Sequence, residues 1–184
     1  MQKLRWGLIG GGEGSQIGFT HRAAAQLDGN FYFDSGALDV DTIKAKKFGK
    51  KLGLSEKKSY GSWEEMLEKE KKNKTSERLD LVTVATPNST HFEITKSFLE
   101  AGFNVLCEKP MTMTVDEGEE IVKIASKSGK LCTVNYCYSA YPMVRQARDM
   151  VQNGELGKIR LIVTNFSHGH HGNAEDANNP RVRW

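Results

Sequence analysis

The sequence predicts an α/β fold with a doubly wound, mainly parallel β-sheet. Apolar runs of strand length alternate with segments of helical period through residues 1–138, which is the order that βαβ units require. A glycine cluster at residues 10–14 follows the first apolar run directly. Because dinucleotide-binding sheets carry a glycine-rich turn after their first strand, we expect residues 1–138 to form a Rossmann-type domain.

The length predicts one complete domain and part of another. The 184 residues exceed one average domain and fall short of two. We therefore expect residues 139–184 to be the beginning of a second, α+β domain. The 26 basic and 23 acidic side chains leave a net charge of +3. Because no nucleic-acid reading module or aromatic stacking platform accompanies this charge, no nucleic-acid partner is expected.

Neither membrane insertion nor secretion is expected. No apolar run approaches the roughly 20 residues of a membrane span, and residues 1–4 lead into a strand without a signal-peptide core. The three cysteines, Cys107, Cys132 and Cys137, lack the spacing of zinc or redox sites. Reduced, structural thiols indicate a cytoplasmic protein.

Local signals delimit the elements of the first half. The expected strands are residues 4–9 and 31–38. The expected helices are residues 17–27, ended by Asp28-Gly29-Asn30, and 41–52, closed by Gly53. Ser62-Trp63-Glu64-Glu65 has the capping-box pattern and predicts the start of another short helix.

The second half continues the alternation. Residues 79–85 read as a central buried strand, followed by a helix at 90–100 and a strand at 104–107. A helix from Thr114 to Lys127 leads to residues 131–136, predicted to be the sixth strand. Beyond a helix at 143–152, residues 158–166 alternate like a half-solvated strand, which predicts the first strand of an antiparallel sheet.

The glycine turn is the first candidate binding site. Gly10 can form the tight turn, Gly12 leaves the backbone open to a pyrophosphate, and Ser15 stands where the third glycine of G-x-G-x-x-G would allow close helix packing. The residues that complete the turn and open the helix are also assigned to cofactor binding: Glu13, Gln16 and Ile17. Backbone N–H groups at this helix start would face the phosphates.

Polar residues follow the other predicted strands and should share one edge of the sheet. Asp39 follows the second strand; a carboxylate there accepts ribose hydroxyls and repels a 2′-phosphate, so NAD is favoured over NADP. The alternative is that Asp39 or Asp41 only caps the next helix. Further cofactor contacts are assigned to residues that follow two later strands: Thr86, Pro87, Asn88 and His91, then Glu108 and Lys109.

Lys109 is the candidate catalytic residue. Pro110 fixes the exit from the strand and restricts Lys109 to an extended backbone, so its ammonium can be directed into the cleft. Partial desolvation, with Glu108 close by, could tune the ammonium to donate a proton or to bind a substrate hydroxyl. A solvated surface lysine is the bland alternative.

Taken together and in order, four motifs resemble the glucose-fructose oxidoreductase / inositol dehydrogenase / MocA-like family. They are Gly7-Leu8-Ile9-Gly10-Gly11-Gly12, Thr86-Pro87-Asn88-Ser89-Thr90-His91, Glu108-Lys109-Pro110 and Gly154-Glu155-Leu156-Gly157. One bacterial branch of sugar or polyol dehydrogenases is resembled by two runs: Gly10-Gly11-Gly12-Glu13-Gly14 with His21-Arg22, and Tyr141-Pro142-Met143-Val144-Arg145-Gln146-Ala147-Arg148. The resemblance implies an NAD(P)-dependent oxidoreductase with Lys109 near the oxidised hydroxyl and a sugar or polyol substrate. It also implies that the domain beginning at residue 139 binds the substrate and that its sheet forms a homo-oligomer.

Two other functions remain open at this point, a non-catalytic NAD(P)-binding sensor and an NAD-dependent glycosidase relative. The family's D-x-x-x-H pattern is absent, so residues 1–184 alone are expected to bind cofactor without turning over a sugar. His168, His170 and His171 lie near Glu175 and Asp176 but without metal-site spacing, so no metal is expected.

Overall fold

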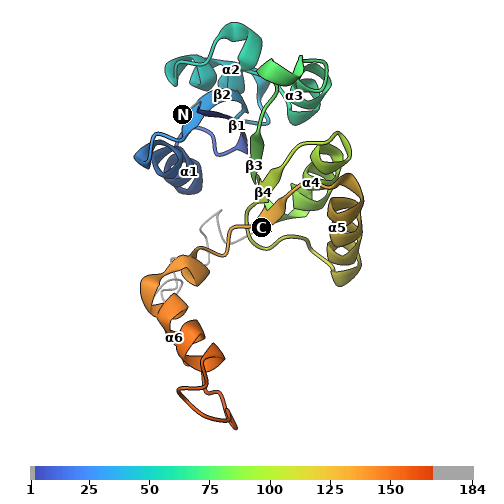
Figure 1. Ribbon diagram of the computed structural model, residues 1–184. Helices are drawn as coiled ribbons and strands as arrows, with labels where there is room; N and C mark the ends of the chain where they lie inside the picture. The colour runs from blue at the N-terminus through green and yellow to red at the C-terminus, as the bar shows by residue number, and fades with distance from the viewer. Residues whose placement is uncertain (1–2, 168–184) are drawn as a thin grey trace, which may run out of the picture. The chain divides into compact units, whose positions relative to one another are not determined.

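The computed structural model describes residues 3–167, which divide into two compact units, one ending at Asn135 and one beginning at Tyr136. The first unit contains a five-stranded, all-parallel sheet flanked by helices (Figure 1). Its strands are β1 (Leu4–Gly10), β2 (Phe31–Ala37), β3 (Leu81–Ala85), β4 (Val105–Cys107) and β5 (Cys132–Val134). The predicted Rossmann-type α/β fold is confirmed.

The helices lie close to their predicted positions. They are α1 (Gln16–Leu27), α2 (Thr42–Lys51), α3 (Trp63–Glu70), α4 (His91–Glu100), α5 (Val115–Ser128) and α6 (Pro142–Gln152), with short 3₁₀ turns η1 (Glu56–Lys58), η2 (Thr75–Glu77), η3 (Asn88–Thr90) and η4 (Cys137–Ala140). Local chemistry explains the starts: Ser62 caps α3, and Thr114 with Glu117 forms a complete capping box on α5.

The strand order β2-β1-β3-β4-β5 reverses direction at β1. The chain moves from β1 to β2 on one side, then crosses back to β3 on the other, and this makes a topological switch point between β1 and β3. Because all pairs are parallel, every carboxyl end lies at the same edge. The switch point and the glycine turn therefore coincide at that edge.

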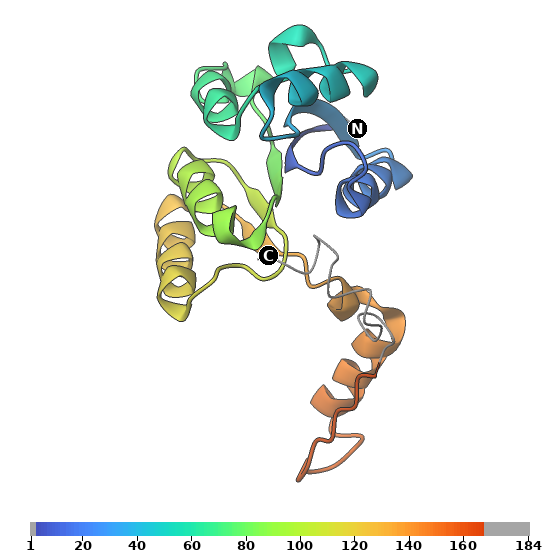
Figure 2. The same cartoon turned by 180° about the vertical axis from the view of Figure 1, so that it is seen from behind.

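Two hydrophobic clusters hold the helices on the sheet. The larger one includes Val82 and Val105 from the strands, Phe98 from α4 and Ile121 from α5. The smaller one joins Trp6 and Leu8 of β1 to Phe48 of α2. Helices α4 and α5 lie side by side on one side of the strands, away from α1, in both views of the molecule (Figures 1 and 2).

Two sequence predictions about strands are wrong. The sheet of residues 3–135 has five strands and not six, since between β2 and β3 the chain makes only an isolated bridge, Gly36 to Ser59. Residues 158–166 form no strand in the described part of the chain. A strand is defined by hydrogen bonds to a neighbouring strand, and the alternating pattern of these residues does not by itself supply that neighbour.

The second unit, as described through Ser167, consists of η4, α6 and the segment that follows. Pro142 opens α6 at a position where its missing N–H is harmless, and Tyr138 packs edge-on against Tyr141 with ring centroids 5.3 Å apart. No α6 residue is buried. The predicted substrate-domain role of residues 139–184 therefore stays a proposal.

A buried carboxylate ties α3 to the sheet. Glu70 is fully buried, and its Oε1 accepts hydrogen bonds from Tyr60 (2.7 Å) and Lys58 (2.9 Å). Burial and the Glu70 carboxylate raise the pKa of Tyr60 well above its ordinary value. Lys58 also pairs with Asp34 of β2 at 3.0 Å. Because these charges are mostly out of water, each depends on its partners.

We expect Glu70→Ala to lower the free energy of unfolding by about 3 kcal/mol, because it leaves buried donors without an acceptor. Urea denaturation measures the change. Glu68→Ala is the matched control, since Glu68 pairs with Lys71 at the exposed surface of the same helix. Equal unfolding midpoints for the two variants would contradict a stabilising role of the Glu70 network.

Candidate functional site

The carboxyl ends of four strands form one edge of the sheet. The parallel register joins their last residues in pairs: Ile9 with Ala37, Gly10 with Ala85, and Val84 with Cys107. Predicted site residues follow each of these ends: the glycine turn, Asp39, Thr86, and Glu108 with Lys109. Since neighbouring strands are about 4.8 Å apart, the ends of β2 and β4 are separated by roughly 14 Å. A ligand that reaches both must be extended.

The glycine turn is constrained by the protein itself. Gly10 has φ +77°, and a Cβ on it would lie 2.4 Å from the Ala85 carbonyl oxygen. A Cβ on Gly12 would lie 2.4 Å from the Leu38 carbonyl oxygen. Both positions therefore require glycine because neighbouring backbone is too close for a side chain. The resulting surface of the turn is bare backbone.

The assignment of the third glycine position to Ser15 is corrected by the structure. Gly18 makes the close helix contact, because a Cβ on it would lie 2.2 Å from the carbonyl oxygen of Gly11. Ser15 is instead the N-cap of α1, and its Oγ accepts a hydrogen bond from the Gly18 N–H at 3.1 Å. Three extra residues between Gly12 and Gly18 conceal this glycine from a search for the standard spacing.

Three predicted site residues in or just before the first turn of α1 are exposed: Glu13, Gln16 and Ile17. Gln16 and Ile17 are exposed in the first turn of α1, where unpaired backbone N–H groups and the positive end of the helix dipole lie. Glu13 is also exposed, and its carboxylate accepts a hydrogen bond from Lys51 of α2 at 2.6 Å. That ion pair holds the pKa of Glu13 below its ordinary value.

A cavity of about 460 Å³ opens at the switch point. Its walls include four predicted site residues, Gly10, Asp39, Thr86 and Pro87. The glycine turn, the end of β2 and the end of β3 thus share one hollow. The predicted site residues Gly12, Ser15 and Asn88 do not line this cavity.

One side of this cavity was not predicted from the sequence. Ser62, Trp63 and Glu64, at the start of α3, also line it. The Ser62-Trp63-Glu64-Glu65 pattern was recognised only as a helix start, because nothing local shows that the start of α3 faces the end of β2. An exposed Val40 (99% accessible) beside Asp39 lines the cavity as well.

The two roles proposed for Asp39 and Asp41 separate clearly. Asp41 is the N-cap of α2, and its Oδ1 accepts hydrogen bonds from the N–H groups of Ile43 and Lys44. Asp39 Oδ1 accepts a single bond from the Asp41 N–H, at 2.9 Å. Asp39 Oδ2, 3.4 Å from a Cβ built on Gly12, has no hydrogen-bond partner within residues 3–167. This oxygen is available to a ligand beside the turn.

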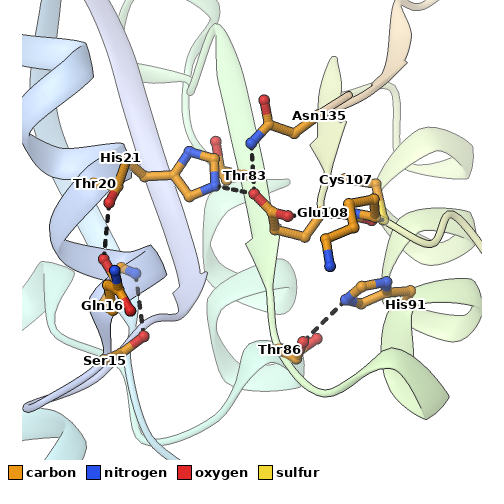
Figure 3. Close-up of polar contacts among 12 residues, drawn as sticks. Ser15, Gln16, Thr20, His21, Thr83, Thr86, His91, Cys107, Glu108 and Asn135 are labelled. Carbon is orange, nitrogen blue, oxygen red and sulfur yellow. Dashed lines mark hydrogen bonds and ion pairs between the residues drawn. The ribbon is translucent and has the colours of Figure 1, made fainter. Parts of the chain in front are cut away.

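His91 connects two loops of the edge. It is fully buried, with Nε2 2.9 Å from the carbonyl oxygen of Thr86 and Nδ1 2.7 Å from that of Pro110 (Figure 3 shows the Thr86 contact). The ring thus lies between the loop after β3 and the loop after β4, and both of its nitrogens contact protein backbone.

Glu108 is the centre of a buried polar cluster, with 7% of its surface exposed. Its Oε1 lies 2.8 Å from His21 Nε2 and accepts a bond from Asn135 Nδ2 at 2.6 Å; the three side chains point toward one another in Figure 3. Burial alone would raise the pKa of Glu108, but the bonds from His21 and Asn135 outweigh it and hold the pKa below its ordinary value.

Lys109 follows Glu108 and is exposed. Its backbone N–H donates to Glu108 Oε2 at 3.2 Å, and its peptide bond to Pro110 is cis. Within the described residues its ammonium makes no ion pair. The backbone of Lys109 is thus anchored while its side chain is available for a ligand.

Further predictions from the sequence concern the cysteine thiols, metal binding and membrane insertion. Burial raises the pKa of Cys107 to about 11, so this thiol, in β4, is poorly nucleophilic at neutral pH. Among residues 3–167 no group of His, Cys, Asp and Glu side chains is arranged to hold a metal ion, and no helix there has the length and apolarity to span a membrane. The cluster of His168, His170 and His171 lies outside the described residues.

Comparison with known proteins gives concordant results. Residues 4–136 match the family model described as "Oxidoreductase family, NAD-binding Rossmann fold". The chain is 41% identical over 167 residues to an uncharacterised oxidoreductase, YfiI, of Bacillus subtilis, covering 90% of this chain and 42% of that protein. It is 33% identical to a D-xylose 1-dehydrogenase (NADP⁺) of Hypocrea jecorina, over 71% of this chain and 32% of the relative.

A solved structure is also similar. The inositol dehydrogenase homologue of Azotobacter vinelandii, complexed with NADH and myo-inositol, superimposes with a TM-score of 0.88 at 40% identity, covering 96% of this chain and 46% of that one. The chain therefore spans less than half the length of the relatives it matches.

The Glu108 cluster predicts a pH dependence of stability. Because the folded protein holds the pKa of Glu108 below 4.5, the unfolded state binds the proton more readily, and stability falls as the pH drops below about 5. Glu108→Gln should remove this contribution. The difference in unfolding free energy between wild type and variant, measured in urea from pH 7 to pH 3.5, should shrink toward low pH; a constant difference would contradict the interpretation.

Proposed function

Because the chain belongs to the Gfo/Idh/MocA family of NAD-binding oxidoreductases, we propose that it binds NAD at the carboxyl edge of its sheet and serves an oxidoreductase of sugars or polyols. The observation that carries the proposal is the meeting, at one edge, of a bare glycine turn, an available carboxylate oxygen on Asp39 and the exposed ammonium of Lys109. The named substrates of the relatives, xylose and myo-inositol, support the substrate class.

The residues of the edge fit a dinucleotide. Gly10 and Gly12 present backbone without side chains, and the first turn of α1, capped by Ser15, supplies N–H groups for the pyrophosphate. The cavity of about 460 Å³ between Asp39 and Pro87 offers room for the adenosine half. We propose further cofactor contacts from the other residues at this edge: Glu13, Gln16, Ile17, Thr86, Asn88, His91 and Glu108.

Asp39 supports a preference for NAD. Its Oδ2 lies beside the glycine turn without a protein partner in the described chain, so it can accept hydrogen bonds from ribose hydroxyls. A 2′-phosphate at the same place would meet a like charge. A relative named as NADP⁺-dependent shows that the family also contains the other choice.

Lys109 is proposed as the catalytic residue. NAD, when bound, supplies a hydride acceptor. In the reducing direction the Lys109 ammonium donates a proton to the substrate carbonyl oxygen as this oxygen becomes a hydroxyl, and the oxidising direction reverses that transfer. The anchored backbone of Lys109 limits the volume that its amine explores, which favours proton transfer over a fixed distance.

The domain assignments, the oligomeric state and the location in the cell are also proposals. We propose that residues 1–138 are the cofactor domain, that residues from 139 begin the substrate domain, and that the protein forms homo-oligomers through the sheet of that domain. The free thiols of Cys107 and Cys132 support a cytoplasmic location. Substrate selectivity would then come mainly from outside the first unit.

In the full-length protein, Lys109→Met should lower kcat by about 100-fold or more, because a positioned proton donor or acceptor contributes roughly 10²–10⁴-fold. The affinity for NAD, measured by calorimetry, should stay nearly unchanged. The exposed Lys57 provides a control, since Lys57→Met removes a surface lysine that does not line the cavity. An unchanged rate of hydride transfer in the Lys109 variant would remove this residue from the mechanism.

Asp39→Ser should bring the dissociation constants of NAD and NADP closer together, because the variant loses both the ribose acceptor and the repulsive charge. Fluorescence titration with both reduced cofactors measures the ratio. Asp41→Ser retains an N-cap side chain and serves as the control with an unaltered ratio. If the ratio is the same in wild type and Asp39→Ser, Asp39 does not contact the ribose.

A further inference from the structure

Two adjacent residues of α1 hold the two ends of the candidate site. His21 Nε2 lies 2.8 Å from Glu108 Oε1, next to Lys109. Arg22 donates from Nη1 to the carbonyl oxygen of Gly11 at 2.7 Å. Adjacent residues on an α-helix project about 100° from each other, so one turn of α1 can contact both Glu108 and the glycine turn. Neither contact is used by the function proposed above.

The start of α1 is fixed at the glycine turn. Gly18 packs directly on Gly11, and the guanidinium of Arg22 lies over the ring of Phe48, 5.2 Å from its centroid. Arg22 therefore bonds the turn from a side chain that is itself held by α2. Because these contacts fix α1, His21, one residue before Arg22, has a fixed position relative to the sheet.

The contact of His21 with Glu108 is well shielded from water. His21 and Glu108 are 8% and 7% exposed, and Asn135 of the loop after β5 shares the same carboxylate oxygen. The other oxygen, Oε2, accepts the backbone N–H of Lys109. Loss of His21 would leave a buried carboxylate with one fewer donor, so the carboxylate would turn toward water and release the backbone that it holds.

We propose that His21 is a positioning residue for Lys109, which acts through the Glu108 carboxylate and links the cofactor-binding helix to the catalytic end of β4. The inference rests on the proposed role of Lys109 in proton transfer. His21 touches neither reacting atom; it fixes the orientation of Glu108, and Glu108 fixes the backbone from which the lysine side chain extends.

Kinetics of the full-length protein with NAD and a panel of polyols test the inference first. His21→Leu, of similar size and without a donor, should lower kcat at least tenfold and leave the dissociation constant of NAD within about twofold, since small misplacements of a reacting group are costly. His21→Gln can place an amide donor near Glu108 and should recover most of the lost kcat. An unaltered kcat in His21→Leu would overturn the proposal.

Hydrogen exchange provides a readout that needs no turnover. In His21→Leu the amide of Lys109 should lose protection at least tenfold, and His21→Gln should restore it, with peptides spanning residues 106–111 followed by mass spectrometry. Arg22→Met should raise exchange in residues 10–15 instead, because it frees the Gly11 carbonyl. Equal protection of residues 106–111 in wild type and His21→Leu would overturn the proposal, as would loss of protection spread evenly over the sheet.

The two measurements separate failure of the inference from failure of the proposed function. If wild type reduces NAD with none of the polyols, the substrate assignment fails, and the exchange data still decide whether His21 positions the Lys109 backbone. If wild type turns over and His21→Gln is as slow as His21→Leu although both are folded, hydrogen bonding by His21 is not the cause, and the inference fails.

Discussion

The parallel hydrogen bonding of β1 to β5 is the constraint on which the candidate site depends. Parallel strands bring every carboxyl end to one edge, so Gly10 and Ala85, 75 positions apart in the chain, become neighbours there. The reversal of strand order at β1 then leaves a hollow between the connections to β2 and β3. Asp39 and Thr86 both line that hollow, which neither strand could form alone.

The glycine turn shows how the same backbone serves packing and binding. Gly10 lies against the carbonyl oxygen of Ala85, the last residue of β3, Gly12 against that of Leu38, just after β2, and Gly18 against Gly11. These contacts demand glycine whether or not a ligand is bound. The close approach they allow places the start of α1 at the sheet edge, where its unpaired N–H groups are suited to an anion. Fold stability and the proposed cofactor binding therefore depend on the same residues.

Two buried carboxylates give the first unit its fixed geometry. Glu70 collects donors from Tyr60 and Lys58, and Glu108 collects them from His21 and Asn135. The donors to Glu108 come from α1 and from the residue after β5, so this carboxylate connects two distant segments; those to Glu70 come from one stretch, Lys58 to Tyr60, which it holds against α3. Buried charges of this kind contribute little net stability, but they penalise any arrangement that leaves them unpaired. That penalty keeps the Lys109 backbone in one position.

Local sequence patterns predicted much of this protein. Hydrophobic period and capping residues such as Thr114 located the helices to within a residue or two, since these signals act over one turn. The residue types of Asp39 and Lys109, placed after strands, indicated a dinucleotide site because parallel topology puts strand ends together. Segment identity and the class of site were thus set by short-range physics.

Only the tertiary structure decided the contacts between distant segments. Gly18 rather than Ser15 makes the close helix contact, Trp63 lines the cavity, and His21 meets Glu108 from 87 residues away. The alternating residues 158–166 form no strand in the described chain, because a strand requires a partner that the pattern itself does not supply. Sequence period reports which face of a segment is apolar; the contacts that the segment makes depend on where the rest of the chain lies.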